Sequence, residues 1–150
     1  MVFVQSNTNC FTDNYCAGVE FSGKDLSGRR VMGFTENGTL SNLTVCNARN
    51  MWDIPNEWSM EDAATVPVSY STVLYALIEK GRITTGQNIL IHAGAGAVGL
   101  SAINVALYYK CNIFTTVGSI NKSNFLKKLY PSLSDKQIGS SRDCSFYNMI

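Results

Sequence analysis

The sequence predicts an α/β fold in which a β-rich region is followed by the first βαβα part of a doubly wound parallel sheet. Up to about residue 59, short apolar runs are broken by Gly, Asn, Asp and Ser, which is typical of strands joined by turns. After Pro55 the spacing of apolar residues becomes helical. From residue 88 onward strand and helix patterns alternate, which indicates a parallel sheet with right-handed crossovers.

The β-rich region is expected to contain three short strands, at residues 18–21, 30–34 and 43–46. Polar residues and glycines at 22–25 and 36–38 mark the turns between them. A short helix is expected next, because Ser59 precedes Asp62 by three residues, a spacing that resembles a capping box. The acidic side chain also favours the positive end of the helix dipole.

A second helix is expected over residues 69–80, after Pro67 has interrupted the first. Apolar residues recur on one face of this segment at helical spacing, namely Val73, Leu74, Leu77 and Ile78. Gly81 follows at the position where a helix C-terminus favours a residue with positive φ.

The pattern of the alternating part of the chain predicts strand 88–92, glycine turn 93–97, helix 98–109, strand 113–117 and helix 122–130. A third short strand is expected near residues 137–140, and Ser145 and Phe146 are expected to open a further helix. This order is that of a doubly wound sheet.

The most specific motif is G-x-G-x-x-G at residues 94–99, directly after an apolar strand and at the start of a helix. Gly94 permits a tight turn, Gly96 a close backbone approach to a pyrophosphate, and Gly99 close packing of helix on strand. Free N–H groups and the helix dipole then face the anion. The motif predicts dinucleotide binding; the alternative is a turn whose glycines serve packing only.

The end of the second alternating strand favours NADPH over NADH. An NAD site usually carries Asp or Glu here to accept from the ribose 2′-OH, whereas residues 117–122 contain no acid. Ser119 can donate to a 2′-phosphate, and Lys122 can pair with it. The alternative is that Lys122, Lys127 and Lys128 form a solvated helix face.

The composition argues against several classes of function. The 150 residues include 12 basic and 11 acidic ones, a net charge of +1, which argues against binding of nucleic acid or an anionic membrane. The five cysteines form no C-x-x-C pair and there is one histidine, so neither a zinc site nor a disulfide framework is indicated. The N-terminus does not resemble a secretory signal, which predicts a reducing, cytoplasmic location.

No catalytic residue is assigned from the sequence. His92 ends the first alternating strand, where a histidine more often hydrogen-bonds or packs than acts as an acid or base. Cys111 and Cys144 have no activating partner in the sequence and are expected to be buried, inert thiols.

A series of motifs in one order extends from about Gly18 to the last residue. The motifs are E-F-S-G from Glu20, S-G-R-R-V-M-G from Ser27, W-D-I-P from Trp52, E-D-A-A-T-V-P-V-S-Y-S-T from Glu61, I-H-A-G-A-G-A-V-G from Ile91, F-T-T-V-G-S from Phe114 and S-R-D-C-S-F from Ser141. Together they resemble the enoyl reductase domain of animal type I fatty acid synthase. This domain lies in the zinc-free branch of the medium-chain dehydrogenase/reductase superfamily.

The resemblance implies a partial GroES-like substrate-binding region over residues 1–66, followed by the N-terminal part of a Rossmann NADPH-binding domain over residues 67–150. The cofactor would lie in the cleft between the two. The implied reaction passes a hydride from NADPH to the β-carbon of a trans-2-enoyl thioester on acyl carrier protein, and the α-carbon is protonated. The implied partners are that carrier protein and the other domains of a homodimeric fatty acid synthase.

The resemblance also implies roles for single residues. Residues 94–99 would hold the pyrophosphate, Lys122 would match the family lysine near the 2′-phosphate, and Thr72 would approach the nicotinamide. The family lysine is typically followed by arginine, whereas Ser123 follows Lys122 here, which weakens the NADPH preference. The residues assigned to the cofactor are Gly94, Ala95, Gly96, Ala97, Val98, Gly99, Ser119, Lys122 and Thr72.

The family's proposed proton donors, a lysine and an aspartate, lie beyond Ile150, as do the later strands of the sheet. The chain is therefore expected to be a fragment that lacks enoyl reductase activity in isolation. Two alternatives stay open. One is a stand-alone reductase similar to quinone oxidoreductases, and the other is a non-catalytic remnant that binds nucleotide.

Overall fold

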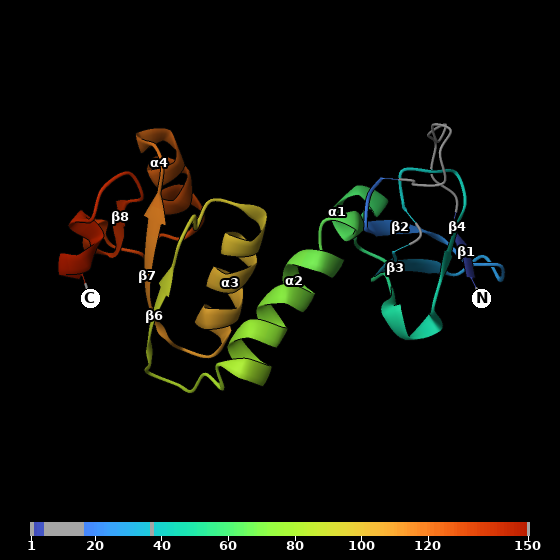
Figure 1. The fold of residues 1–150 in the computed structure, drawn as a ribbon, viewed down its shortest axis with the longest axis horizontal. Helices are drawn as coiled ribbons and strands as arrows, with labels where there is room; N and C mark the ends of the chain where they lie inside the picture. Colours follow the sequence, from blue (N-terminus) through green and yellow to red (C-terminus); the bar gives the residue numbers. More distant parts are fainter. Residues whose placement is uncertain (1, 5–16, 37, 150) are drawn as a thin grey trace. The chain divides into compact units, whose positions relative to one another are not determined.

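The computed structural model describes residues 2–4, 17–36 and 38–149, which form two compact units, Met1–Ser69 and Tyr70–Ile150 (Figure 1). The first unit is built mainly of antiparallel strands, and the second contains a parallel sheet with helices between its strands. The α/β class predicted from the sequence is confirmed. Asn37, in one of the predicted turns, lies outside the described residues.

The first unit contains two small antiparallel sheets. Strands β2 (Glu20–Lys24), β3 (Arg30–Phe34) and β5 (Met51–Asp53) pair in the order β2-β3-β5, and β1 (Val2–Val4) pairs with β4 (Thr44–Cys46). The short 3₁₀-helix η1 (Ala48–Asn50) precedes β5. Alternate residues of β2 and β3 are buried, as expected for strands with one covered face, and Phe21, Val31 and Cys46 form a buried cluster in this unit.

Strand β2 continues through Lys24, so the turn predicted at residues 22–25 is wrong and lies further along the chain. The carboxylate of Asp25 accepts from the backbone N–H groups of Ser27 and Arg29, both at 2.9 Å, and thereby closes the loop. Gly28 has φ +84 in this loop, a conformation that glycine adopts without steric cost. Side-chain hydrogen bonding by aspartate therefore decides where the hairpin turns.

Helix α1 (Met60–Ala64) begins at the predicted cap, where the Oγ of Ser59 accepts from the N–H of Asp62 at 2.9 Å. Helix α2 (Pro67–Val73) begins two residues before the predicted start and continues as the π-helix η2 (Leu74–Lys80). The predicted positive φ at Gly81 is wrong, because its φ is −78. A Cβ at Gly81 would lie 2.9 Å from the carbonyl oxygen of Leu77, so the wide helical turn needs glycine for space.

The second unit contains the parallel sheet β6 (Asn88–Ile91), β7 (Asn112–Val117) and β8 (Ile138–Ser140), in that order (Figure 1). Helices α3 (Ala97–Tyr108) and α4 (Ile120–Leu129) connect successive strands, and two 3₁₀-helices flank β8, η3 (Asp135–Gln137) and η4 (Ser145–Met149). Fully buried residues of the core include Ile103 of α3 and Leu126 of α4. Because the strands are parallel, the loops that follow β6, β7 and β8 meet at one edge of the sheet.

Candidate functional site

The glycine turn joins β6 to α3 at the carboxyl edge of the parallel sheet. The N–H of Gly94 donates to the carbonyl oxygen of Thr116 at 3.0 Å, and the N–H of Gly96 donates to that of Ala93 at 2.9 Å. Ala93 has φ +55, so an alanine and not a motif glycine takes the left-handed conformation of this turn. The first bond fixes the turn to β7, and the second closes it on itself.

Two of the three motif glycines are required by packing within the protein. A Cβ on Gly94 would overlap the Oγ1 of Thr115, and one on Gly99 would overlap the carbonyl oxygen of Ala93 and lie 2.7 Å from the Cα of Gly94. Thr115 is fully buried, and its hydroxyl donates to the carbonyl oxygen of Ile91 at 2.8 Å, so it has little room to move. Gly94 and Gly99 therefore allow α3 to approach the sheet closely.

Gly96 differs from its two neighbours in the motif. A Cβ there would have one close neighbour, the carbonyl oxygen of Ala93 at 3.3 Å, and its φ of −89 suits any residue. Gly96 is the N-cap of α3 and offers no side chain to the first helical turn, whose N–H groups have no acceptor within the helix. The end of α3 is thus open to an anion, and the glycine leaves room for a close approach.

A cavity of about 190 Å³ adjoins this turn at the carboxyl edge of the sheet. Its lining consists of Ala93, Ala95, Gly96, Val117, Gly118, Lys122, Ser141 and Arg142. The structure therefore brings the predicted residues Ala95, Gly96 and Lys122 to one place. Arg142, which follows β8, was not among the predicted site residues; the predicted strand near residues 137–140 is the signal that could have placed it at this edge.

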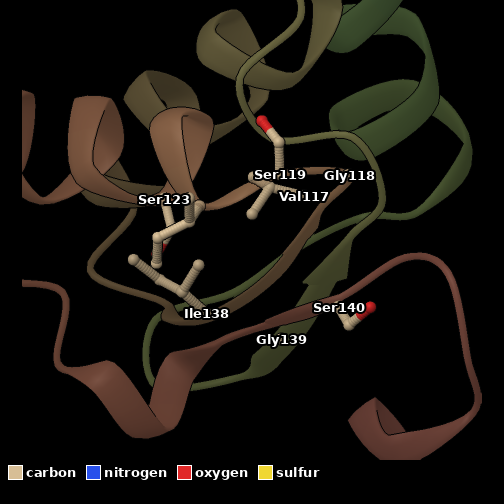
Figure 2. Close-up of a pocket in the computed structure, with 8 residues that line it drawn as sticks. Val117, Gly118, Ser119, Ser123, Ile138, Gly139 and Ser140 are labelled. Atoms are coloured by element: carbon tan, nitrogen blue, oxygen red, sulfur yellow. The ribbon is translucent and has the colours of Figure 1, made fainter.

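A second hollow, of about 260 Å³, lies beside the first and shares Val117 and Gly118 with it. Figure 2 shows its lining, to which the end of β7, the first turn of α4 and β8 contribute Val117, Gly118, Ser119, Ile120, Ser123, Ile138, Gly139 and Ser140. The lining combines branched apolar side chains with hydroxyl groups. Apolar walls with a few polar groups are typical of small-molecule sites.

Ser119 and Lys122 lie at the start of α4. Ser119 is the N-cap, and its Oγ accepts from the N–H of Lys122 at 3.4 Å, which leaves the hydroxyl proton able to donate to an anion. Lys122 is exposed at the cavity and forms no salt bridge with any acid among the described residues. Lys127, in contrast, pairs with Asp135. The lysines of α4 therefore have different surroundings.

The other residues considered from the sequence lie outside the cavity. Thr72 is a residue of α2 and does not line the cavity at the glycine turn. His92 hydrogen-bonds and packs, as predicted, because its Nδ1 lies 3.0 Å from the Oγ1 of Thr116 and its ring contacts Phe146 edge-on. Cys111 is buried as predicted, but the prediction for Cys144 is wrong, since this thiol is exposed in the loop after β8.

Neither a metal cluster nor a membrane-spanning helix occurs in the part of the chain that the structure describes. Residues 2–4, 17–36 and 38–149 contain no group of three or more His, Cys, Asp and Glu side chains arranged to hold a metal ion. Within the same ranges, no helix combines the length and the apolar character that crossing a membrane requires.

Known proteins resemble this chain in sequence and in structure. No family model matches it. The highly-reducing polyketide synthase 1 of Aureobasidium melanogenum is 38% identical over 136 residues, which cover 87% of this chain and 6% of the synthase. The crystal structure of the CurK enoyl reductase superposes with a TM-score of 0.82 at 31% identity, over 91% of this chain and 42% of that one. The chain belongs with the enoyl reductase domains of the medium-chain dehydrogenase/reductase superfamily.

Solved structures of lower sequence identity also share the fold of this chain. The quinone oxidoreductase from Thermus thermophilus has a TM-score of 0.73 at 22% identity, over 94% of this chain and 50% of that one. The chain thus spans half or less of the length of these relatives. The Aureobasidium relative is a polyketide synthase, so its similarity does not single out the fatty acid synthase type that the motifs resemble.

Proposed function

We propose that this chain binds NADPH and forms the nucleotide-binding part of the enoyl reductase of a multidomain synthase. One observation carries the proposal: the bare backbone of Gly96, at the open end of α3, lines the same cavity as Lys122. Helix-end N–H groups suit a pyrophosphate, and a nearby ammonium group suits a further phosphate. Chemically, the residues present at this edge of the sheet fit a phosphorylated dinucleotide.

Each part of the cofactor has proposed binding residues in this chain. Residues 94–99 would hold the pyrophosphate, and the adjoining hollow between α4 and β8 would hold the adenine ring. Ser119 and Lys122 would bind the 2′-phosphate, through a hydroxyl donor and an ammonium charge. Thr72 would approach the nicotinamide, as the family resemblance implies. The absence of an acid at the end of β7 supports NADPH over NADH.

The proposed reaction is the reduction of a trans-2-enoyl thioester carried on acyl carrier protein. When bound, NADPH supplies the hydride that adds to the β-carbon, and a proton added at the α-carbon completes the saturated thioester. The residues of this chain hold and orient the nucleotide. The fatty acid synthase motifs support a fatty acid synthase as the parent protein, and the identity to a polyketide synthase supports the alternative. Either parent would surround this reductase with other domains.

Binding measurements on the 150-residue chain test the proposal. Isothermal titration with NADPH and NADH should give tighter binding of NADPH. Lys122→Ala should weaken NADPH binding about tenfold, because a charge-assisted contact to phosphate is lost, and should leave the affinity for NADH nearly unchanged. Lys128→Ala removes the same charge from an exposed position of α4 outside the cavity and should leave both affinities unchanged. Failure of the unaltered chain to bind either nucleotide would refute the proposal.

A further inference from the structure

A second cation lies in the cavity that contains Lys122. Arg142 lines the same space, although it comes from the loop after β8 and not from α4. Neither side chain forms a salt bridge with an acid among the described residues. Two cations from different elements therefore meet at one edge of the sheet, without the acidic partners that surface cations often have.

The loop that carries Arg142 is tied to the sheet. The N–H of Ser141 donates to the carbonyl oxygen of Val117 at 3.0 Å, which extends the pairing of β8 with β7 by one bond. The N–H of Arg142 itself donates to the Oγ of Ser140 at 3.0 Å. The backbone position of Arg142 is thus fixed relative to the end of β7, where the predicted 2′-phosphate residues begin.

The guanidinium group of Arg142 lies directly against Gly118. Its Nε is 3.5 Å from the carbonyl oxygen of Gly118, and a Cβ on Gly118 would lie 2.9–3.3 Å from three guanidinium atoms. This contact uses the absence of a side chain at the residue before Ser119. It directs the arginine toward the loop between β7 and α4, and most of its N–H donors remain available to a ligand.

The acid next to Arg142 is occupied elsewhere. The Oδ1 of Asp143 accepts from the N–H of Ser145 at 2.8 Å, and hydrogen bonds from Ser145 and Ser140 lower the pKa of this carboxyl group. Its ionised form therefore stabilises the turn into η4, and it forms no salt bridge with Arg142. Position 123 of α4 provides no further cation, because its residue is the uncharged Ser123, which is also buried.

We propose that Arg142 is the second cation for the 2′-phosphate and, together with Lys122, sets the preference of this chain for NADPH. The proposal rests on the proposed function, because it assumes that a dinucleotide occupies this cavity. Guanidinium binds phosphate with two parallel N–H donors, whereas lysine contributes a point charge. An arginine supplied by the loop after β8 would compensate for the uncharged Ser123 that follows Lys122.

Titration of the 150-residue chain with NADPH and NADH tests this assignment. Arg142→Gln keeps much of the side chain's length and removes its charge. It should weaken the affinity for NADPH about tenfold and change the affinity for NADH less than about twofold. The roughly tenfold value is at the low end for a charged hydrogen bond because the site is exposed. The NADPH preference of the unaltered chain should also decline as salt is added. Lys128→Ala is the charge-matched control, and thermal unfolding checks that each variant is folded.

Two results would contradict the assignment of Arg142, and they differ in what they mean for the proposed function. If the unaltered chain binds both nucleotides and Arg142→Gln weakens both equally or neither, the role of Arg142 is overturned and the proposed function stands. If the unaltered chain binds neither nucleotide, the proposed function fails and the assignment of Arg142 fails with it. Arg142→Lys provides a further check, since a retained point charge should give an NADPH affinity between those of the unaltered chain and Arg142→Gln.

Discussion

Alanine substitutions at Gly96 and Gly99 should separate cofactor binding from folding within one motif. At Gly99 a Cβ would overlap the carbonyl oxygen of Ala93 and lie 2.7–2.8 Å from backbone atoms of Gly94, so the turn itself must move. Overpacking of this kind costs about 1–3 kcal/mol. For a unit of this size, each kcal/mol lowers the melting temperature by about 4–8 °C. At Gly96 the nearest atom would be 3.3 Å away, and the expected loss, mainly of a good N-cap residue, is below about 1 kcal/mol.

The binding data should show the opposite ranking. Gly96 lines the cavity where the pyrophosphate is proposed to lie, so the added methyl group of Gly96→Ala should weaken NADPH binding by about tenfold or more while the chain stays folded. Urea unfolding followed by circular dichroism gives the stability, and isothermal titration gives the affinity. Either of two results would contradict this assignment of Gly96: Gly96→Ala binding NADPH as tightly as the unaltered chain, or Gly96→Ala unfolding as readily as Gly99→Ala.

Three further predictions concern the core, an exposed carboxyl group and a thiol. Leu126→Ala should cost about 2–5 kcal/mol in urea unfolding, because Leu126 is fully buried, whereas Leu129→Ala on the exposed face of the same helix should cost far less. Hydrogen bonds from Ser27 and Arg29 lower the pKa of Asp25 to about 2, so its stabilising effect should be present above pH ~4 and lost as the pH falls through about 2, a dependence that Asp25→Asn should remove. Alkylation of the folded chain, analysed by peptide mass spectrometry, should modify Cys144 and spare buried Cys111; equal labelling would contradict the structure.

The sequence predicts the parallel part of the fold well, because local signals there agree with one another. The apolar strand before Gly94, the glycine spacing and the helical pattern after it all require the same β6-turn-α3 unit, which the structure contains. The N-cap at Ser59 was also predictable, since it depends on side chains three residues apart. Each of these features is determined by neighbours along the chain.

Features that depend on distant contacts or on small backbone differences were missed. Residues 74–80 form the π-helix η2 and Gly81 after it has φ −78, yet the apolar spacing of this segment resembles that of an α-helix. The turn of the first hairpin depends on which residues the Asp25 carboxylate reaches. Arg142 reaches the cavity because β8 pairs in parallel with β7, a contact between segments more than twenty residues apart; the local pattern predicts the strand but not its pairing partner.

The G-x-G-x-x-G motif therefore carries two kinds of information. Gly94 and Gly99 are required for close packing of the helix on the parallel strand. They therefore indicate the fold, and by themselves they do not indicate a ligand. At Gly96 a Cβ would contact one described atom closely, the carbonyl oxygen of Ala93 at 3.3 Å, and a shift of a few tenths of an ångström would relieve this contact. Gly96 lies at a helix end without a side-chain cap and lines a cavity with two cations. A bound anionic ligand explains a glycine at this position better than packing within the protein does. Gly96 and its charged neighbours Lys122 and Arg142 thus indicate a phosphorylated nucleotide more specifically than the motif as a whole does.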